Sequence, residues 1–223
     1  MKKRISCNAI IFDMDGTIVD TNVIWDTATQ RLLMAKGVDY TPAIHKAVRT
    51  MLMGGAGGLR HGCALLKQMF DLSDTAEALA QEKKQYAHEE YARGIKFIDG
   101  FVDFHSKIAH LPTGIATNAD NHTLLLTNKA LNLERFFGKH MYGISHVNHL
   151  GKPHPAIFLH VAQQLGQEPA RCVVIEDSET GIKAARAAGI FCIGINTHRN
   201  RDLVALADIV VDHYDEIDFL DCE

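Results

Sequence analysis

The chain has 223 residues, about 1.5 times a typical domain length, so one or two domains are expected. Hydrophobic residues make up 47% and charged residues 22% of the chain, as in an ordinary soluble globular protein. This composition excludes a disordered chain, a collagen and a coiled coil. The 23 Lys and Arg against 27 Asp and Glu give a formal net charge of -4. A mildly acidic chain is unsuited to general nucleic-acid binding, because such binding depends on clustered positive charge.

The cysteines and the N-terminal region bear on the cellular compartment. The chain has five cysteines, namely Cys7, Cys63, Cys172, Cys192 and Cys222. Because they are odd in number, scattered and without a CxxC pair, they favour a reducing compartment over a disulfide framework or a zinc knuckle. The apolar run that ends at Asp13 lacks a signal-peptide cleavage site, and no apolar stretch approaches the roughly 20 residues that span a bilayer. We therefore expect a cytoplasmic protein without a membrane partner.

The first predicted element is a strand, and helices follow it. Residues 7–13 form a short apolar run that ends in a carboxylate, which is typical of a buried parallel strand. From about residue 21 to residue 94 the hydrophobic pattern is helical. Four helices are expected there: one that carries Trp25, Ala28, Leu32 and Ala35 and stops before Gly37, one that begins at Thr41-Pro42, one over 59–70, and one from Ser73 to Gly94. A glycine-rich segment, Gly54–Gly58, separates the second from the third.

After residue 94, strand patterns alternate with helical patterns. The short apolar runs cover 114–117, 141–144, 173–176, 191–195 and 209–211. The helical patterns between them cover 121–131, 155–165 and 181–188. This βαβ alternation predicts an α/β protein with a parallel, doubly wound sheet, into which an all-helical block is inserted after the first strand. We expect one domain over 1–18 and 95–223 and a helical domain over 19–94.

Polar motifs follow the strands of this predicted sheet. Ligands of such sheets bind outside the carboxyl ends of the strands. The first strand ends in Asp13-Met14-Asp15-Gly16-Thr17, and the second ends in Thr117-Asn118. A later loop carries Gly151-Lys152-Pro153-His154-Pro155, and the strand over 173–176 ends in Glu176-Asp177-Ser178. Carboxylates, a hydroxyl group and a lysine are therefore expected at one edge of the sheet.

These four motifs, in this order and each at a strand end, resemble those of the haloacid dehalogenase superfamily, and the resemblance covers essentially the whole chain. The branch that it points to has a helical cap inserted after the first motif, and includes phosphoglycolate phosphatases and beta-phosphoglucomutases. The resemblance implies a Rossmann-like core with a cap domain. It also implies an enzyme that hydrolyses a small phosphorylated metabolite, such as phosphoglycolate or a sugar phosphate, through an aspartyl-phosphate intermediate.

The resemblance also implies a role for each candidate residue. Asp13 is expected to be the nucleophile and Asp15 the general acid and base. Thr117 and Lys152 complete the expected catalytic set, in which Lys152 offsets negative charge on Asp13 and on the phosphoryl group. The groups expected to bind phosphate or substrate are the amides of Met14 and Asp15 and the side chains of Thr117, Asn118, Lys152 and Arg60.

A cluster of carboxylates that faces a phosphate group requires a cation. Mg²⁺ is the expected cofactor, because it is a hard ion that takes carboxylate, water and phosphate oxygens as ligands. The expected ligands are the carboxylates of Asp13 and Asp177 and the carbonyl oxygen of Asp15. Glu176 is expected to bind the ion directly or through water.

Other functions are weighed against this one. A sugar phosphomutase similar to beta-phosphoglucomutase is the alternative, but those enzymes carry a histidine twelve positions after the nucleophile, where this chain has Trp25. A non-catalytic phosphate sensor would be expected to lack the nucleophile or a metal carboxylate, and neither is missing. Asp15 counts against the dehalogenase and phosphonate-cleaving branches, because the first lacks this aspartate and the second replaces it. The expected partner is a small phosphorylated metabolite, bound by a monomer or a homodimer.

The roles of several further residues have more than one interpretation. Five histidines lie in one region of the chain, namely His140, His146, His149, His154 and His160. They match no transition-metal ligand pattern and are expected to be exposed, with His154 at the edge of the site as an alternative. The Gly54–Gly58 segment is interpreted as a mobile cap loop near the substrate, with a plain linker as the alternative. Arg60 and His61, just after it, are candidates for substrate contact. Trp25 is interpreted as a residue of the cap core.

Overall fold

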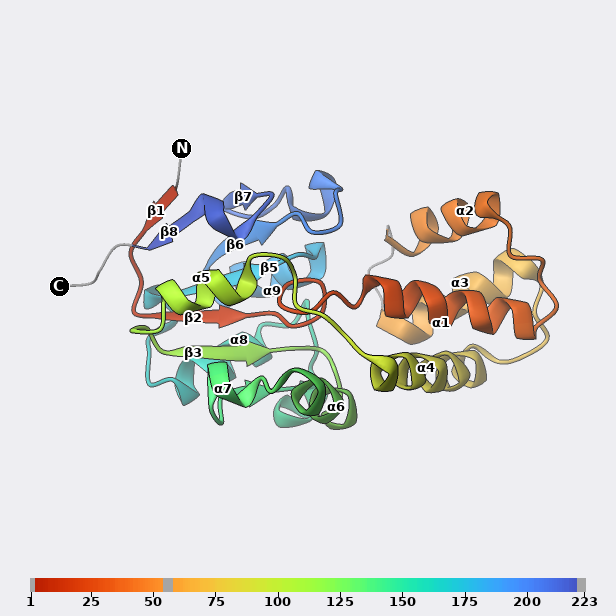
Figure 1. Ribbon diagram of the computed structural model, residues 1–223, viewed down its shortest axis with the longest axis horizontal. Helices are drawn as coiled ribbons and strands as arrows, with labels where there is room; N and C mark the ends of the chain where they lie inside the picture. Colours follow the sequence, from red (N-terminus) through yellow and green to blue (C-terminus); the bar gives the residue numbers. More distant parts are fainter. Residues whose placement is uncertain (1–2, 54–57, 220–223) are drawn as a thin grey trace. The chain divides into compact units, whose positions relative to one another are not determined.

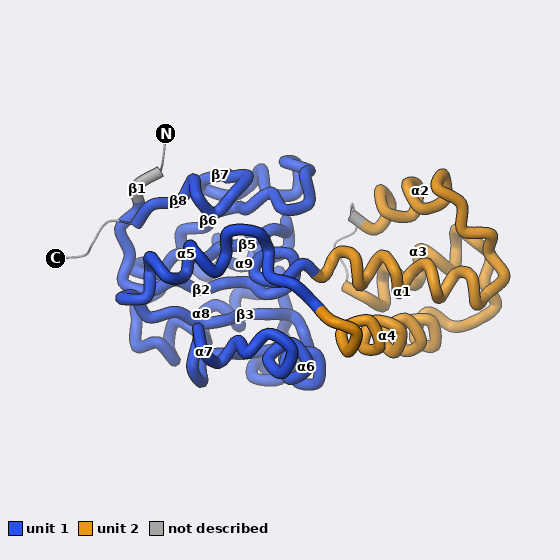
Figure 2. Tube along the Cα trace, viewed as in Figure 1, with its two compact units in different colours: residues 1–20, 95–223 blue, residues 21–94 orange. Residues whose placement is uncertain are grey.

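The computed structural model describes residues 3–53 and 58–219. The chain divides into two compact units, shown in Figure 2: unit 1 comprises residues 1–20 and 95–223, and unit 2 comprises residues 21–94. Unit 1 therefore contains both the first strand and everything after the helical block. Residues 54–57, which form most of the predicted glycine-rich loop, lie outside the described residues.

Unit 1 is built on a six-stranded sheet in which every neighbouring pair is parallel. The strands are β2 (Ala9–Phe12), β3 (Thr113–Ala116), β4 (Met141–Tyr142), β5 (Cys172–Glu176), β6 (Phe191–Ile195) and β7 (Ile209–Val211). Their order is β4-β3-β2-β5-β6-β7, and β1 (Lys3–Ile5) pairs with β8 (Ile217–Phe219) in a separate parallel sheet (Figure 1). The predicted Rossmann-like α/β class is confirmed.

Helices cover both faces of this sheet. They are α5 (Phe101–Lys107), α6 (Asn121–Leu131), α7 (Glu134–Phe137), α8 (Ala156–Gln164) and α9 (Glu179–Ala187). Short 3-10 helices η1 (Ile144–Val147), η2 (Pro169–Arg171), η3 (Arg201–Val204) and η4 (Tyr214–Glu216) lie in the connections. Alternate residues of β2 reach opposite layers, as the two-residue period of a strand requires. Ile10 and Phe12 join the core under α5 to α7, whereas Ala9 and Ile11 join the core under α8 and α9.

The strand order places a topological switch next to β2. From β2 the chain moves outward to β3 and β4, and it then returns to the other side of β2 with β5, β6 and β7. Phe12 pairs with Ile115 of β3 and with Ile175 of β5, so the residues after these three strands emerge at the same level. In open α/β sheets the ligand binds at the carboxyl edge of such a switch point. The polar motifs of the sequence lie at this edge.

Unit 2 consists of helices α1 (Asn22–Ala35), α2 (Pro42–Met53), α3 (Gly58–Phe70) and α4 (Ala76–Arg93). Its buried core residues are Leu32, Leu33, Val48, Cys63, Leu66, Leu72, Leu79 and Ala80. The predicted start of α2 is confirmed, because Thr41 Oγ1 accepts a hydrogen bond from the amide of Ile44 at 3.3 Å.

Some predicted boundaries are wrong. The fourth helix of unit 2 begins at Ala76 and not at Ser73, because Thr75 caps it by accepting a hydrogen bond from the amide of Ala78 at 3.2 Å. Ala35, predicted on the apolar face of α1, is exposed. The run over 141–144 forms a strand only over Met141–Tyr142, because η1 begins at Ile144.

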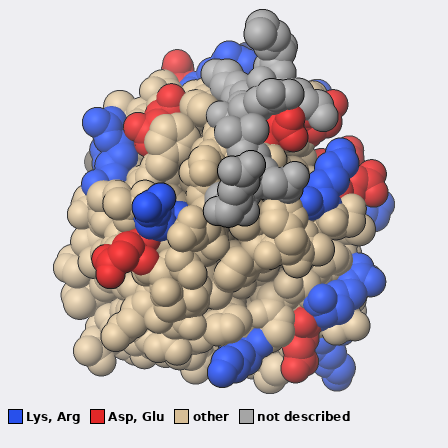
Figure 3. Space-filling view, turned by 90° about the vertical axis from the view of Figure 1, so that its left-hand side faces the viewer, with Lys and Arg blue, Asp and Glu red and all other residues tan. Residues whose placement is uncertain are grey.

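The described surface adds two observations. No helix among the described residues combines the length and the apolar character that a membrane span needs. Figure 3 views unit 1 from the side at which β2 and β3 begin. On the described part of this face, Lys and Arg side chains are interspersed with Asp and Glu, so no continuous surface of one charge sign is seen.

A buried histidine in unit 1 makes stability depend on pH. His105 of α5 is 8% exposed, its ring centroid lies 5.0 Å from that of Phe136 and 5.4 Å from that of Phe137, and its Nε2 is 3.3 Å from Thr113 Oγ1. Burial lowers its pKa from the ordinary value of 6.5. As the pH falls below 6.5, the unfolded chain therefore binds a proton that the folded chain does not bind. The stabilisation by neutral His105 is complete above the unfolded pKa and is lost as the pH falls towards the folded pKa.

We therefore expect the free energy of unfolding to fall with decreasing pH, with a contribution from His105 of at most about 1.4 kcal/mol per pH unit. Urea unfolding between pH 7.5 and pH 5 measures this dependence. His105→Phe should flatten it, whereas His149→Asn, at an exposed position, should leave it unchanged. Equal slopes for the wild type and His105→Phe would contradict the assignment.

Candidate active site

The turn after β2 presents two aspartates at the carboxyl edge of the sheet. The amide of Asp13 donates a hydrogen bond to Ile175 O of β5 at 3.0 Å, and the turn closes through hydrogen bonds from the amides of Ile18 and Val19 to Met14 O, both 3.0 Å. Gly16 adopts a φ of 83°, which favours glycine, and a Cβ atom there would lie 2.0 Å from Asp177 Oδ2. The sequence Asp-Met-Asp-Gly-Thr therefore forms a tight turn in which position 16 requires glycine.

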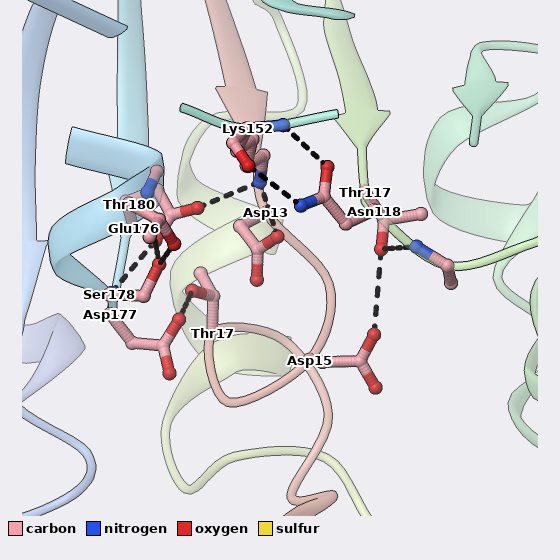
Figure 4. A network of polar contacts seen from close by, with 12 residues as sticks. Asp13, Asp15, Thr17, Thr117, Asn118, Lys152, Glu176, Asp177, Ser178 and Thr180 are labelled. Carbon is pink, nitrogen blue, oxygen red and sulfur yellow. Dashed lines mark hydrogen bonds and ion pairs between the residues drawn. The ribbon is translucent and has the colours of Figure 1, made fainter. Parts of the chain in front are cut away.

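Lys152 connects two of the predicted carboxylates. Its Nζ lies 2.5 Å from Asp13 Oδ1 and 2.7 Å from Glu176 Oε1, and its side chain is only 3% exposed (Figure 4). Asn118 holds the backbone of this lysine, since Asn118 Oδ1 accepts from the amide of Lys152 at 2.8 Å and Asn118 Nδ2 donates to Lys152 O at 3.4 Å. The Asn118 side chain, predicted to bind phosphate, is thus engaged with the loop that carries Lys152.

Glu176 lies at the end of β5 and has both carboxylate oxygens engaged. Oε1 contacts Lys152, and Oε2 accepts hydrogen bonds from the amide and from the hydroxyl group of Ser178, both 2.8 Å. A Cβ atom on Gly181 in the first turn of α9 would lie 1.7 Å from Oε1, so glycine is required for this close approach. These contacts fix Glu176 as the partner that orients Lys152.

Asp177 is held by two donors from other parts of the chain. Thr17 Oγ1 donates to Asp177 Oδ1 at 3.1 Å, and His198 Nε2 lies 2.5 Å from Asp177 Oδ2. His198 is absent from the candidates predicted from the sequence, although it lies only three residues after the end of β6. Its position at the carboxyl end of a strand of the same sheet is the signal that could have identified it.

Thr117 and Asp15 contact each other on the other side of Asp13 (Figure 4). Thr117 is 1% exposed, its Oγ1 accepts a hydrogen bond from the amide of Ala119 at 3.0 Å, and it lies 3.5 Å from Asp15 Oδ2. The carboxylate of Asp15 is therefore held near the end of β3. Asp13 lies between this pair and the residues that follow β5.

The remaining candidates from the sequence are Arg60 and the five histidines between residues 140 and 160. Arg60 belongs to α3 of unit 2, where its Nε lies 3.3 Å from Glu77 Oε2 and its side chain is 76% exposed. His146, His149 and His154 are exposed as expected. His140 and His160 are instead half-buried, with both rings packed near Tyr142, so the expectation of exposure is wrong for these two.

The charges of this site strongly perturb one another. Burial raises the pKa of Asp13 well above its ordinary value; the ammonium of Lys152 opposes this rise, and Glu176 and Asp177 add to it. For Lys152, burial lowers the pKa, but attraction to Asp13 and Glu176 outweighs burial and raises the pKa overall. Lys152 therefore remains an ammonium group. Three buried carboxyl groups, those of Asp13, Glu176 and Asp177, thus lie around this one ammonium group.

The same carboxylates fit a hard divalent cation. Asp13, Glu176 and Asp177 are all buried and offer oxygen atoms within 4.8 Å of one another. Carboxylate oxygens are the ligands that Mg²⁺ prefers, and three carboxyl groups around one ammonium group leave room for a second cation beside Lys152. The donor set therefore fits Mg²⁺.

Comparison with known proteins identifies the family. A family model described as haloacid dehalogenase-like hydrolase matches residues 7–189. The chain belongs to this hydrolase family. Membership confirms the resemblance that the four motifs indicated, and the matched residues include all four.

Two curated relatives and one solved structure illustrate the similarity. A phosphorylated carbohydrates phosphatase from Thermotoga maritima is 31% identical over 90% of this chain and 90% of its own length. A fructose-1-phosphate phosphatase from Escherichia coli is 30% identical over 83% of this chain and 95% of its own length. The crystal structure of a haloacid dehalogenase family hydrolase from Deinococcus radiodurans, with bound phosphate and sodium, covers 94% of this chain and 93% of its own, with 28% identity and a TM-score of 0.74.

Proposed function

We propose that this protein is a Mg²⁺-dependent phosphatase that hydrolyses a small sugar phosphate or a similar metabolite through an aspartyl-phosphate at Asp13. That the chain is a phosphoric monoester hydrolase follows from its family and from the phosphatases among its relatives. The single observation that carries the mechanistic proposal is the pairing of Asp13 Oδ1 with Lys152 Nζ at 2.5 Å, within a buried carboxylate cluster. The carbohydrate class is supported by the substrates that the names of the two curated relatives give.

In the first half-reaction, Asp13 attacks the phosphorus atom of the substrate. Lys152 binds Oδ1, which leaves Oδ2 as the attacking oxygen. As the new bond from Oδ2 to phosphorus forms, the bond from phosphorus to the ester oxygen breaks, and Asp15 transfers its proton to that oxygen. The products are a neutral alcohol and a phosphorylated Asp13. Thr117 limits the orientation of Asp15 through the 3.5 Å contact between Thr117 Oγ1 and Asp15 Oδ2.

In the second half-reaction, water replaces Asp13 on phosphorus. Asp15, now a carboxylate, removes a proton from the water as its oxygen attacks. The bond between Asp13 Oδ2 and phosphorus breaks, phosphate leaves, and both aspartates return to their starting protonation states. Lys152 stabilises the carboxylate of Asp13 as it is released.

The proposed Mg²⁺ ligands are the carboxylates of Asp13 and Asp177 and the carbonyl oxygen of Asp15, with Glu176 next to the ion. When bound, the ion supplies positive charge that reduces repulsion between these carboxylates and the phosphoryl oxygens. In this proposal Glu176 binds the ion directly or through water, while its two oxygens keep their contacts with Lys152 and Ser178.

Hydrolysis is favoured over phosphoryl transfer to a second sugar by the residue twelve positions after Asp13. This residue is Trp25, which is half-buried in α1 and has the ammonium of Lys83 5.8 Å from its ring centroid. An indole nitrogen only donates hydrogen bonds, so Trp25 cannot accept a proton from a sugar hydroxyl group as a neutral histidine can. Water is therefore the proposed acceptor.

Removal of divalent cations tests the metal assignment. We expect hydrolysis of 4-nitrophenyl phosphate to fall at least about tenfold in EDTA and to return with added Mg²⁺, because the carboxylate cluster repels the substrate phosphate. Screening sugar phosphates and phosphoglycolate under the same conditions ranks the substrates. Undiminished turnover by exhaustively chelated enzyme would contradict the metal assignment, and faster hydrolysis of phosphoglycolate than of every sugar phosphate would contradict the carbohydrate class.

A further inference from the structure

His198 makes a contact that the proposed mechanism does not use. It lies in the loop after β6, with its Nε2 2.5 Å from Asp177 Oδ2, and the side chains are 18% and 4% exposed respectively. A carboxylate oxygen can only accept a hydrogen bond, so Nε2 carries the hydrogen atom and donates it. The neutral imidazole and the imidazolium both make this contact.

The second oxygen of the same carboxylate is also held. Thr17 Oγ1 donates to Asp177 Oδ1 at 3.1 Å, and the side chain of Asp177 is therefore bound at both oxygens. The turn after β2 leaves little space around this carboxylate, because a Cβ atom on Gly16 would lie 2.0 Å from Asp177 Oδ2 and 3.2 Å from His198 Nε2. Two hydrogen bonds and this close packing select one orientation of Asp177.

The loop that carries His198 has its own attachments to the rest of unit 1. Thr197 Oγ1 donates to Gly16 O at 2.6 Å. At the base of the loop, the amide of Asn196 donates to Val211 O at 2.8 Å, and Asn196 Nδ2 donates to Asp212 Oδ1 at 2.8 Å. Loss of the imidazole should therefore leave the loop in place and remove the contact with Asp177.

We propose that His198 is a positioning residue that, together with Thr17, orients Asp177 for binding of the divalent cation. This inference rests on the proposed function, because it assigns His198 a role at the same metal site. Each carboxylate oxygen has two lone pairs, so Asp177 can bind a metal ion while it keeps its hydrogen bonds to Thr17 and His198. Loss of such an outer partner of a metal ligand typically lowers metal affinity 10- to 100-fold. His198 is then a determinant of Mg²⁺ affinity that lies outside the four motifs.

Direct measurement of Mg²⁺ binding tests this role. Isothermal titration calorimetry on the metal-free full-length chain should show a dissociation constant for Mg²⁺ that is about 10- to 100-fold weaker in His198→Ala than in the wild type. His198→Gln, whose amide nitrogen can reach the same carboxylate oxygen as a donor, should restore most of the affinity. His213→Ala, at an exposed histidine after β7, is the matched control and should bind like the wild type.

A second readout separates positioning from a general structural role. The melting temperature in EDTA should be nearly equal for the wild type and His198→Ala, because the attachments of Asn196 and Thr197 remain. At saturating Mg²⁺, the hydrolysis of 4-nitrophenyl phosphate by His198→Ala should approach that of the wild type, since the loss is in affinity for the ion.

The outcomes distinguish this inference from the proposed function. Wild-type affinity in His198→Ala, or failure of His198→Gln to restore an affinity lost in His198→Ala, would overturn the role of His198. If the wild type then still binds Mg²⁺ and hydrolyses the phosphate ester, the proposed function stands without it. A wild-type chain that does not bind Mg²⁺ would overturn both.

Discussion

Asp13→Asn should abolish hydrolysis, with a loss of about 10⁴-fold or more in kcat. The substitution keeps the size of the side chain but replaces the attacking carboxylate oxygen with an amide, which is a poor nucleophile towards phosphorus. It also removes one of the two carboxylates that contact Lys152, while Glu176 keeps its 2.7 Å contact and holds the ammonium in place. The fold should therefore survive, and the loss should be specific to the chemistry.

Steady-state hydrolysis of 4-nitrophenyl phosphate at saturating Mg²⁺ gives the size of this effect, and intact-mass analysis of enzyme quenched during turnover gives its cause. No phosphorylated chain should form in Asp13→Asn. Asp99→Asn, at an exposed position in unit 1, is the matched control for the loss of one carboxylate charge and should behave like the wild type. Turnover by folded Asp13→Asn within a hundredfold of the wild type would be incompatible with a nucleophilic Asp13.

The edge of the sheet at which the site lies could be predicted from the sequence, because the end of a strand is recognised from adjacent residues alone. A short apolar run followed by a carboxylate, a hydroxyl group or an amide identifies a strand end without knowledge of the neighbouring strands. Parallel strands then bring their carboxyl ends together. Phe12 pairs with both Ile115 and Ile175, so Asp13 and Glu176 lie at one level and Thr117 lies one residue beyond it.

The partners within the site could not be predicted in the same way. Asn118 was expected to face phosphate, but its amide has the right length and geometry to bond both the N–H and the C=O of Lys152, 34 residues away. The contact of His198 with Asp177 depends on how the loop after β6 turns towards the loop after β5. The position of a histidine after a strand makes it a candidate, but it does not identify the side chain that the histidine contacts.

Three short elements of unit 1, namely β1, β8 and α5, were also not predicted from the sequence. They have few apolar residues or pair with distant parts of the chain. The strands β1 and β8 have three residues each and pair residues near opposite ends of the sequence, so neither contains a periodic pattern that a local reading detects. Helix α5 has only seven residues, but Phe101 and Phe104 bury its apolar side against Phe12 of β2. Tertiary packing, and not local propensity, stabilises these short elements.

Asp15→Asn should fail differently from Asp13→Asn. It keeps the nucleophile but removes the group that donates a proton to the leaving oxygen and later accepts one from water. Loss of a general acid or base typically slows a step by about 10²–10⁴-fold. The size of Asn matches that of Asp, and its side chain can still contact Thr117, which lies 3.5 Å from Asp15 Oδ2 in the wild type. The rates of the two half-reactions should then depend differently on the leaving group of the substrate.

With 4-nitrophenyl phosphate the leaving group needs little protonation, so formation of the aspartyl-phosphate should be slowed much less than its hydrolysis. Asp15→Asn should therefore accumulate a chain that carries one phosphoryl group, detected by intact mass, and peptide mapping should place the group on Asp13. With an alkyl phosphate such as a sugar phosphate, both steps need the proton transfer, and much less phosphorylated chain should accumulate. The double variant Asp13→Asn, Asp15→Asn should show no label with either substrate. Phosphate on another residue, or equal accumulation from the aryl and the alkyl substrate, would refute the roles assigned to these two aspartates.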